Sequence, residues 1–347
     1  MAAADSHAAP TLEGGYQALI VAGGPPDSPA NRIDPNTADS PFSGVVSINI
    51  RYDGLSYICT GTMITPRHVL TAAHCVDTTD LGNVIDITAP GNDVRIVVNT
   101  SNTPLIITAN KVTMHPDYHG FGICPPSSGL QGQCLNDDVA ILELPTAVPD
   151  DVKIYGFGNL APTDSLFTMV GYGTSGDGIN GYNVSPSFFI KRDGQNIWDL
   201  YDTNDEELYD PNSPMEVWYY DFDGTSFGVN RDLFCLLEGV CSEQLANDVE
   251  THVGGGDSGG PSFIKDANGN YILVANNTFG GNYCGWPDLI NGGTSPCRNG
   301  DFGDIGGGIL LYSYFEWIRN SVPEPGSLAL VGLALLGLAG ARRRQRR

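Results

Sequence analysis

One serine of the sequence stands in a run of glycines, the setting that a nucleophilic serine requires. Ser258 lies within GGGDSGGP, residues 254–261. Glycines let backbone N–H groups approach a reacting carbonyl oxygen closely, and a serine among them is placed to attack the carbonyl carbon. A serine hydroxyl is a weak nucleophile, so this chemistry also needs a base nearby.

The order of the histidines along the chain identifies the candidate base. The six are His7, His68, His74, His115, His119 and His252, and all of them precede Ser258. The segment GDSGG also fits the G-x-S-x-G motif of α/β-hydrolases, but in that fold the histidine follows the serine, so the order excludes it. His74 is the candidate because it lies in LTAAHC, where small residues leave room for a packed imidazole. His68 and His115 are interpreted as surface or structural residues.

An acid that orients the imidazole should lie buried at the edge of a strand. The segment NDDVAILEL, residues 136–144, places two carboxylates directly before an apolar run. Asp138 fits this role best, and Asp137 is the alternative. The sequence thus offers His74, Asp138 and Ser258 as a catalytic triad in that order.

The eight cysteines form four pairs that are close in sequence, which predicts disulfides and an oxidising compartment. The expected pairs are Cys59 with Cys75, Cys124 with Cys134, Cys235 with Cys241, and Cys284 with Cys297. The first pair would close a loop of about 15 residues, stabilise the fold by about 3 kcal/mol and hold His74 in place. No pair has the two-residue spacing of structural zinc ligands, so we expect no metal.

The composition favours short strands over long helices. Hydrophobic residues make up 41% of the chain, which supports a buried core, and 44 glycines and 23 prolines mark many turns. Strands are expected in the first half at 45–50, 57–58, 84–87, 94–98, 105–107 and 139–142, and in the second half between 167 and 311. A proline-bearing link at 145–162 separates the halves, and residues 312–320 predict a helix. We expect an all-β protein with two domains.

Together, the histidine, aspartate and serine segments resemble the trypsin-like (chymotrypsin-fold) serine protease family over roughly residues 33–320. The resemblance implies two six-stranded antiparallel β-barrels, about 33–150 and 163–311, with the active site between them and a short C-terminal helix. It also implies that His74 takes the proton of Ser258 and that Asp138 fixes the imidazole tautomer. The N–H groups of Gly256 and Ser258 would bind the oxyanion, and an acyl-enzyme would then hydrolyse.

The same resemblance points to residues that bind the substrate. The substrate-pairing strand should run through Thr278, Phe279 and Gly280. Six residues before Ser258, His252 takes the place of the aspartate with which trypsin binds lysine or arginine. Strict cleavage after basic residues is therefore not expected. A histidine there would favour acidic side chains or be an ordinary packed residue.

Activation by cleavage is a further expectation from the resemblance. Cleavage after Arg32 would make Ile33 a new N-terminus, whose ammonium group would pair with Asp257 and shape the oxyanion hole. The segment LIVAGG, residues 19–24, is closer to that terminus in composition but lies farther upstream. We prefer Arg32–Ile33, which makes residues 1–32 a leader or propeptide-like segment and residues 33–321 the protease domain.

The charge of the chain excludes one class of partner. Acidic residues outnumber basic ones by 40 to 17, which gives a net charge of −23, and five of the basic residues lie in the last six positions. Such a field repels phosphate backbones, so nucleic acid is not expected as a partner. The acidic stretch 202–224 contains the oxygen ligands that calcium prefers, but no ligand spacing there defines a site, and we expect no cofactor.

The C-terminal residues 322–347 have the layout of a sorting signal. VPEPGS is followed by an apolar run at 328–341 and then by RRRQRR. The run is shorter than the roughly 20 residues that cross a bilayer, and the arginines would stay on the cytoplasmic side. These three parts resemble a PEP-CTERM signal of Gram-negative bacteria, which an exosortase recognises and removes.

That resemblance implies a precursor tethered to the inner membrane and a mature protein that reaches the cell surface, the extracellular matrix or the medium. Residues 1–24 contain no lysine or arginine and only a short apolar stretch, so no signal peptide is visible. We interpret this start as truncated or wrongly assigned, because the cysteines and the C-terminal signal both require export.

The sequence therefore predicts an exported serine endopeptidase that acts on proteins or peptides. Two alternatives stay open: a catalytically inert, protease-like binding domain of the bacterial envelope, and an acidic component of the extracellular matrix. All three triad segments are whole, which favours the enzyme, because inert homologues usually lose one of the three residues.

Overall fold

The structure is a computed structural model that describes residues 20–101, 103–126, 134–159, 161–206, 210–226, 229–281 and 298–322. The chain divides into two compact units, Met1–Tyr314 and Phe315–Arg347. The first unit contains all the strands given below. Of the second unit, the structure describes α3 (Phe315–Ser321) and Val322.

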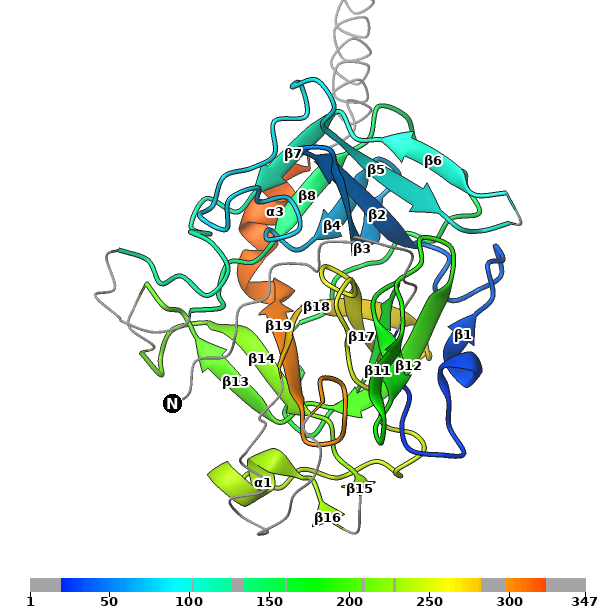
Figure 1. Ribbon diagram of the computed structural model, residues 1–347. Helices are drawn as coiled ribbons and strands as arrows, with labels where there is room; N and C mark the ends of the chain where they lie inside the picture. The colour runs from blue at the N-terminus through cyan, green and yellow to red at the C-terminus, as the bar shows by residue number, and fades with distance from the viewer. Residues whose placement is uncertain are drawn as a thin grey trace, which may run out of the picture. The chain divides into compact units, whose positions relative to one another are not determined.

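Seven strands from the first half of the chain form one antiparallel sheet, in the upper part of Figure 1. Their order across the sheet is β6-β5-β2-β3-β4-β8-β7. The strands are β2 (Val45–Tyr52), β3 (Leu55–Thr65), β4 (His68–Thr71), β5 (Asp93–Val98), β6 (Leu105–Thr108), β7 (Lys111–Met114) and β8 (Ala140–Glu143). Alternate residues of a strand point to one face, and Val46, Ile48 and Ile50 of β2 are accordingly buried in one apolar core.

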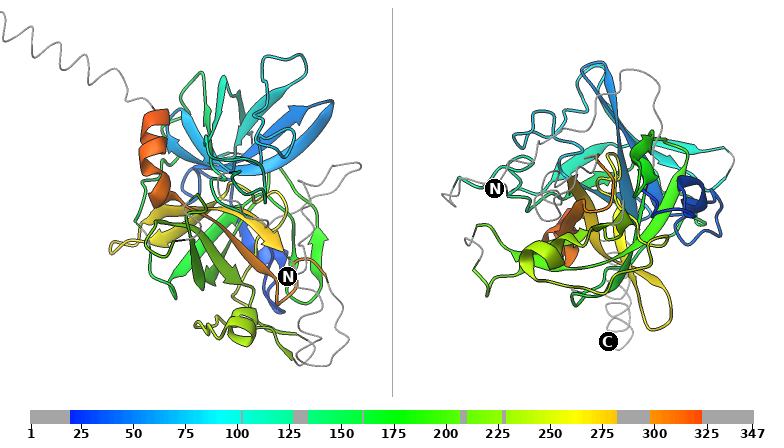
Figure 2. Two further views of the ribbon diagram at one scale, coloured as in Figure 1. Left: turned by 90° about the vertical axis from the view of Figure 1, so that its left-hand side faces the viewer. Right: turned by 60° about the horizontal axis from the view of Figure 1, so that its bottom comes forward.

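Eight strands form a second antiparallel sheet, in the lower part of Figure 1, and the turned views of Figure 2 also show two separate sets of strands. The order is β1-β12-β9-β17-β18-β19-β14-β13. The strands are β1 (Ile33–Asp34), β9 (Leu166–Gly171), β12 (Lys191–Ile197), β13 (Leu200–Thr203), β14 (Met215–Asp221), β17 (Pro261–Lys265), β18 (Tyr271–Gly281) and β19 (Ile305–Leu310). Its core is aromatic: Phe167 packs edge-on against Trp218, with ring centroids 4.9 Å apart.

Short elements complete the description of the first unit. Two small hairpins are formed by β10 (Ser175–Asp177) with β11 (Gly181–Val184) and by β15 (Thr225–Ser226) with β16 (Val229–Asn230). The helical elements are the 3₁₀ helix η1 (Pro29–Arg32), the α-helix α1 (Leu233–Glu238) and the 3₁₀ helix η2 (Leu311–Tyr314). No helix within the described ranges is long and apolar enough to cross a membrane. The predicted tail signal at 323–347 lies outside those ranges.

The predicted all-β architecture of two sheets is confirmed, with three corrections of detail. The sheets contain seven and eight strands rather than six each, because short strands such as β1 and β13 extend the edges of the second sheet. The expected strand at 84–87 is wrong: only Val84 forms a bridge, and the Asp86 carboxylate accepts hydrogen bonds from the N–H and hydroxyl of Thr88, which closes a turn. The expected helix at 312–320 is a 3₁₀ turn followed by α3.

A buried ion pair ties the segment before β2 to the second sheet. In the pairing of β1 with β12, Asp34 stands opposite Lys191. The ammonium group of Lys191 is fully buried, lies 2.9 Å from Oδ2 of Asp34 and donates a hydrogen bond of 2.6 Å to the carbonyl of Phe42. The Asp34 carboxylate also accepts from the hydroxyl of Ser40. Because both charges are paired and hydrogen-bonded, the segment is held at a fixed place.

We predict that Lys191→Met lowers the free energy of unfolding by about 3–5 kcal/mol, because it leaves the Asp34 carboxylate buried without its counter-charge. Urea denaturation of the chain carrying Ser258→Ala, which prevents self-digestion, measures the difference. Lys153→Met is the matched control, since Lys153 is exposed and makes no ion pair within the described residues. Equal stabilities of the two variants would contradict the prediction.

Candidate active site

The register of two neighbouring strands brings His74 and Asp138 together. In the antiparallel pairing of β4 with β8, Thr71 stands opposite Ala140. His74 follows the end of β4 by three residues, and Asp138 precedes the start of β8 by two, so both lie at the same edge of the first sheet. Nδ1 of His74 lies 2.6 Å from Oδ2 of Asp138, and the backbone N–H of His74 donates to Oδ1 at 2.8 Å. The Asp138 carboxylate therefore fixes both the ring and the backbone of His74.

Asp137, the alternative acid, points to a different partner. Its backbone has a positive φ of 63°, and its Oδ1 lies 3.1 Å from Nδ1 of His115. Its N–H donates to the hydroxyl of Tyr314, whose ring packs edge-on against His115. The choice of Asp138 for the pair with His74 agrees with this geometry, and the structural role expected for His115 is to hold Asp137.

The pKa of His74 is raised above its ordinary value. Burial of the ring is the largest single influence and acts to lower the pKa, but the charge and hydrogen bond of Asp138, with smaller contributions from Asp80 and Asp77, outweigh it. The imidazolium form is thus stabilised where it would form after proton transfer.

Ser258 is docked against the first sheet through Thr60, a residue of β3 that the sequence analysis did not identify. The N–H of Thr60 donates to the carbonyl of Ser258 at 2.9 Å, and its hydroxyl donates to the carbonyl of Gly256 at the same distance. Thr60 directly follows Cys59, whose disulfide leads to His74. Cys59 is the disulfide partner of Cys75, the residue after His74, so its neighbour Thr60 could have been expected near the site.

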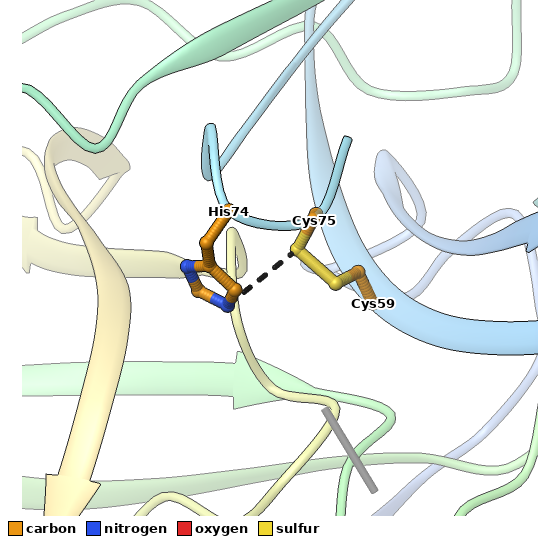
Figure 3. Close-up of side chains that lie close together, drawn as sticks. All are labelled: Cys59, His74 and Cys75. Atoms are coloured by element: carbon orange, nitrogen blue, oxygen red, sulfur yellow. Dashed lines mark hydrogen bonds between the residues drawn. A yellow bond between two sulfur atoms is a disulfide. The ribbon is translucent and has the colours of Figure 1, made fainter. Parts of the chain in front are cut away.

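The Cys59–Cys75 disulfide contacts both segments of the site, as Figure 3 shows for its contact with His74. Sγ of Cys75 lies 3.9 Å from Nε2 of His74 and 3.6 Å from the carbonyl oxygen of Ser258. A sulfur in a disulfide has no proton to donate, so these are packing contacts. They bring the Ser258 loop next to the imidazole.

The hydroxyl of Ser258 is partly exposed, and among the described residues the structure has no hydrogen bond between it and His74. Catalytic hydrogen bonds are often long in an enzyme without substrate. The backbone N–H groups of Gly256 and Ser258 find no acceptor within the described residues, which leaves them available to a ligand. Gly256 has a φ of +101°, which favours glycine at this position.

Asp257 is buried between these two residues without an ionic partner in the described part of the chain. Its carboxylate accepts the N–H groups of Gly173 at 2.7 Å and Gly254 at 2.8 Å. Burial raises its pKa to about 7, although these hydrogen bonds and Arg192 oppose the shift.

The structure places the two candidate activation segments differently, and the preference for Arg32–Ile33 stays a prediction. The side chain of Ile33 is 46% exposed in β1, and Arg32 forms an ion pair with Asp27. Ile20 is instead fully buried, and the next residue, Val21, exchanges both backbone hydrogen bonds with His252. Val21, in the alternative segment, therefore lies beside the part of the chain that leads to Ser258.

His252 is a packed, neutral residue. It is fully buried, its Nδ1 lies 3.2 Å from the hydroxyl of Tyr220, and its ring stacks on Phe222 with centroids 5.5 Å apart. Burial lowers its pKa to about 3. A Cβ atom added to Gly280 would lie 3.3 Å from Nε2 of His252, so the histidine lies beside the predicted substrate strand.

The predicted substrate-pairing residues lie in the last part of β18. Thr278 is buried, Phe279 packs its ring against Tyr219 with centroids 5.4 Å apart, and Gly280 is exposed. The exposed backbone at this end of the strand is the part that a substrate could reach.

Three of the four expected disulfides are present. The structure pairs Cys59 with Cys75, Cys124 with Cys134, and Cys235 with Cys241. Cys284 and Cys297 lie outside the described residues. The pairing by proximity in sequence is confirmed for these three.

Comparisons with known proteins agree with this site. The family model described as Trypsin matches residues 32–185, and the model described as PEP-CTERM protein-sorting motif matches residues 321–344. The first match includes His74 and Asp138 and ends before Ser258. Brachyurin from Leptuca pugilator is 28% identical over 129 residues, which is 36% of this chain and 49% of that protein. The chain therefore spans about half the length of this curated relative.

The part of the chain that matches the Trypsin model holds the paired histidine and aspartate, and the glycine-lined serine lies beyond it, before a strand of the second sheet. Residues 32–185 are thus similar to the trypsin family, and residues 321–344 match the PEP-CTERM protein-sorting motif.

Proposed function

We propose that this protein is an exported serine endopeptidase in which His74, Asp138 and Ser258 form the catalytic triad. The observation that carries the proposal is the hydrogen bond between His74 and Asp138, with the Ser258 loop packed against the same disulfide as the imidazole. The proposed substrates are proteins or peptides, as the protease domain implies.

In the proposed reaction, His74 accepts the proton of the Ser258 hydroxyl as the serine attacks the carbonyl carbon of the peptide bond. The resulting imidazolium is stabilised by Asp138, and the N–H groups of Gly256 and Ser258 bind the oxyanion. The imidazolium then protonates the leaving amine, and water hydrolyses the acyl-enzyme by the same steps. The raised pKa of His74 supports the role of its imidazolium as the acid that protonates the leaving amine.

The proposed specificity follows from the charge of His252. At neutral pH the neutral imidazole of His252 offers no positive charge to an acidic substrate side chain. Because position 252 holds a histidine and not an aspartate, it offers no negative charge to a basic substrate side chain either. Thr278, Phe279 and Gly280 would pair with the substrate backbone. We therefore propose that the substrate residue before the cleaved bond has an uncharged side chain.

The proposed route of the protein rests on its C-terminal motif. A PEP-CTERM motif indicates an exported protein that is processed at the membrane. The finer proposal is a precursor tethered to the inner membrane, cleavage by an exosortase, and release to the cell surface, the matrix or the medium.

Labelling with a fluorophosphonate probe tests the enzyme directly. We expect the wild-type chain to react and Ser258→Ala to lose both labelling and proteolysis, the latter by about 10⁶-fold in kcat. Ser101→Ala is the matched control, because Ser101 is exposed and lies in a loop of the first sheet. Equal labelling of wild type and Ser258→Ala, or labelling of neither, favours the inert binding domain instead.

The pH dependence tests the pair of His74 and Asp138. Only neutral imidazole acts as the base, so kcat/KM should rise with pH, with a midpoint above 6.5 because the pKa of His74 is raised. Asp138→Asn should lower kcat by about 10⁴-fold and move the midpoint to lower pH, because burial then acts with less opposition.

The control for this measurement is Asp137→Asn, which removes the neighbouring carboxylate that faces His115. It should leave the midpoint where it is in the wild type. A wild-type midpoint at or below 6.5, or the same midpoint shift in both variants, speaks against the assigned pair.

The C-terminal processing is tested by intact-mass measurement of protein from a host that has an exosortase. We expect the mature chain to end near residues 322–325 and to lack the apolar run and the arginines, since that run is too apolar for water and short for a lasting span. A mature chain that retains Arg347 contradicts this proposal.

A further inference from the structure

Five carboxylates are buried together at the end of β14, away from the triad residues in the sequence. Asp221, Asp223 and Asp232 each offer an oxygen, and these oxygens lie within 4.8 Å of one another. Oδ2 of Asp199 accepts the N–H of Asp221 at 3.0 Å, and Oε1 of Glu250 accepts the N–H of Asp223. All five residues are between 1% and 6% exposed. We call these five residues the acidic cluster.

No basic side chain compensates this charge within the described part of the chain. None of the five forms an ion pair with lysine or arginine there. Arg231, the neighbour of Asp232 in sequence, acts instead on Asp301, where its charge opposes the burial that raises the pKa of that carboxyl. Five carboxylates are therefore buried side by side without a basic partner among the described residues.

Two oxygens of the cluster, Oδ1 of Asp199 and Oδ1 of Asp223, have no hydrogen-bond partner among the described residues. Oδ1 of Asp223 is buried and accepts no hydrogen bond from any described residue, in a side chain that is 3% exposed. The other carboxylates are anchored by donors that fix their positions: Asp232 accepts from the N–H of Cys235 and the amide of Gln244, and Glu250 accepts from the N–H of Leu245. A buried polar atom without a partner is rare and calls for an explanation, such as an ion.

The chemistry of the donor set identifies the ion. Every group of the cluster offers oxygen ligands, and Cys235, whose N–H binds Asp232, has its sulfur in a disulfide with Cys241. Zinc prefers nitrogen and sulfur, and magnesium keeps several waters in a strict octahedron, whereas calcium accepts six to eight oxygens supplied largely by the protein. We propose that Asp221, Asp223 and Asp232, supported by Asp199 and Glu250, bind one calcium ion.

The proposed calcium site lies next to His252, the residue beside the predicted substrate strand. Phe222, which stands between Asp221 and Asp223, stacks on His252 with an angle of 12° between the rings. Glu250 precedes His252 by two residues. The site is distinct from the triad, and its test does not depend on proteolysis.

The test measures thermal unfolding of the full chain carrying Ser258→Ala, first stripped with EDTA and then supplied with calcium chloride. Calcium at about 100 times its dissociation constant should raise the melting temperature by roughly 5 °C or more. Magnesium chloride at the same concentration should give a much smaller shift. No shift with calcium, or an equal shift with magnesium, overturns the proposal.

Asp223→Asn gives the sharpest result, because its effect should change sign with the ion. In EDTA the variant should melt at a higher temperature than its parent, since it removes one of the mutually repelling carboxylates. In calcium it should melt at a lower temperature, since it loses a ligand. Asp199→Asn should behave in the same direction and serves as the second variant if Asp223→Asn does not fold.

Two controls locate the ion. Asp150→Asn removes an exposed carboxylate and should keep the full calcium shift. Glu206→Gln alters another acidic group, in which Asp137, Asp205 and Glu206 have oxygens within 4.8 Å of one another, and it should also keep the shift. Loss of the shift in Glu206→Gln with retention in Asp223→Asn would show that the acidic cluster is not the calcium site.

Discussion

Hydrogen bonds of Thr60 join the two sheets at the site and hold the loop that carries Ser258. Thr60 is fully buried in β3, and all its polar atoms are used. Its N–H and hydroxyl donate to the carbonyls of Ser258 and Gly256, its hydroxyl accepts the N–H of Tyr172, and its carbonyl accepts the hydroxyl of Thr71. The chain passes so close here that a Cβ on Gly259 would lie 2.0 Å from Oγ1 of Thr71. The glycines around the serine are therefore needed for the contact between the sheets as well as for the N–H groups that face a ligand.

Buried charge is handled in three ways in this acidic protein. Lys191 and Asp34 neutralise each other between β1 and β12. Asp257 is held by two backbone N–H groups and has its pKa raised to about 7 by burial. The acidic cluster accepts several backbone N–H groups but has no basic partner within the described residues, and Oδ1 of Asp199 and Oδ1 of Asp223 have no donor there, which is the reason to assign it an ion. The net charge of the sequence could not predict these buried sites, because exposed carboxylates, which keep a protein soluble, contribute to it in the same way as buried ones.

The sequence predicted the parts of the site that lie on local motifs, and it missed the parts that depend on register. His74, Asp138 and the glycine run could be assigned because each stands in a short, recognisable segment. The choice between Asp137 and Asp138 needed the pairing of Thr71 with Ala140, and Thr60 needed the contact between sheets. The cluster carboxylates come from several separate segments, so no ligand spacing could show them.

The contact of the Cys59–Cys75 sulfurs with His74 and Ser258 links the chemistry of the site to the cell's redox compartments. Cysteine pairs form disulfides in oxidising compartments and remain free thiols in the cytosol. Without this disulfide, the loop that carries His74 loses its covalent tie to β3, next to the residue that docks Ser258. For the serine endopeptidase proposed above, this covalent tie would form only after the chain has left the reducing cytosol, so the site would stay incomplete inside the cell that makes it.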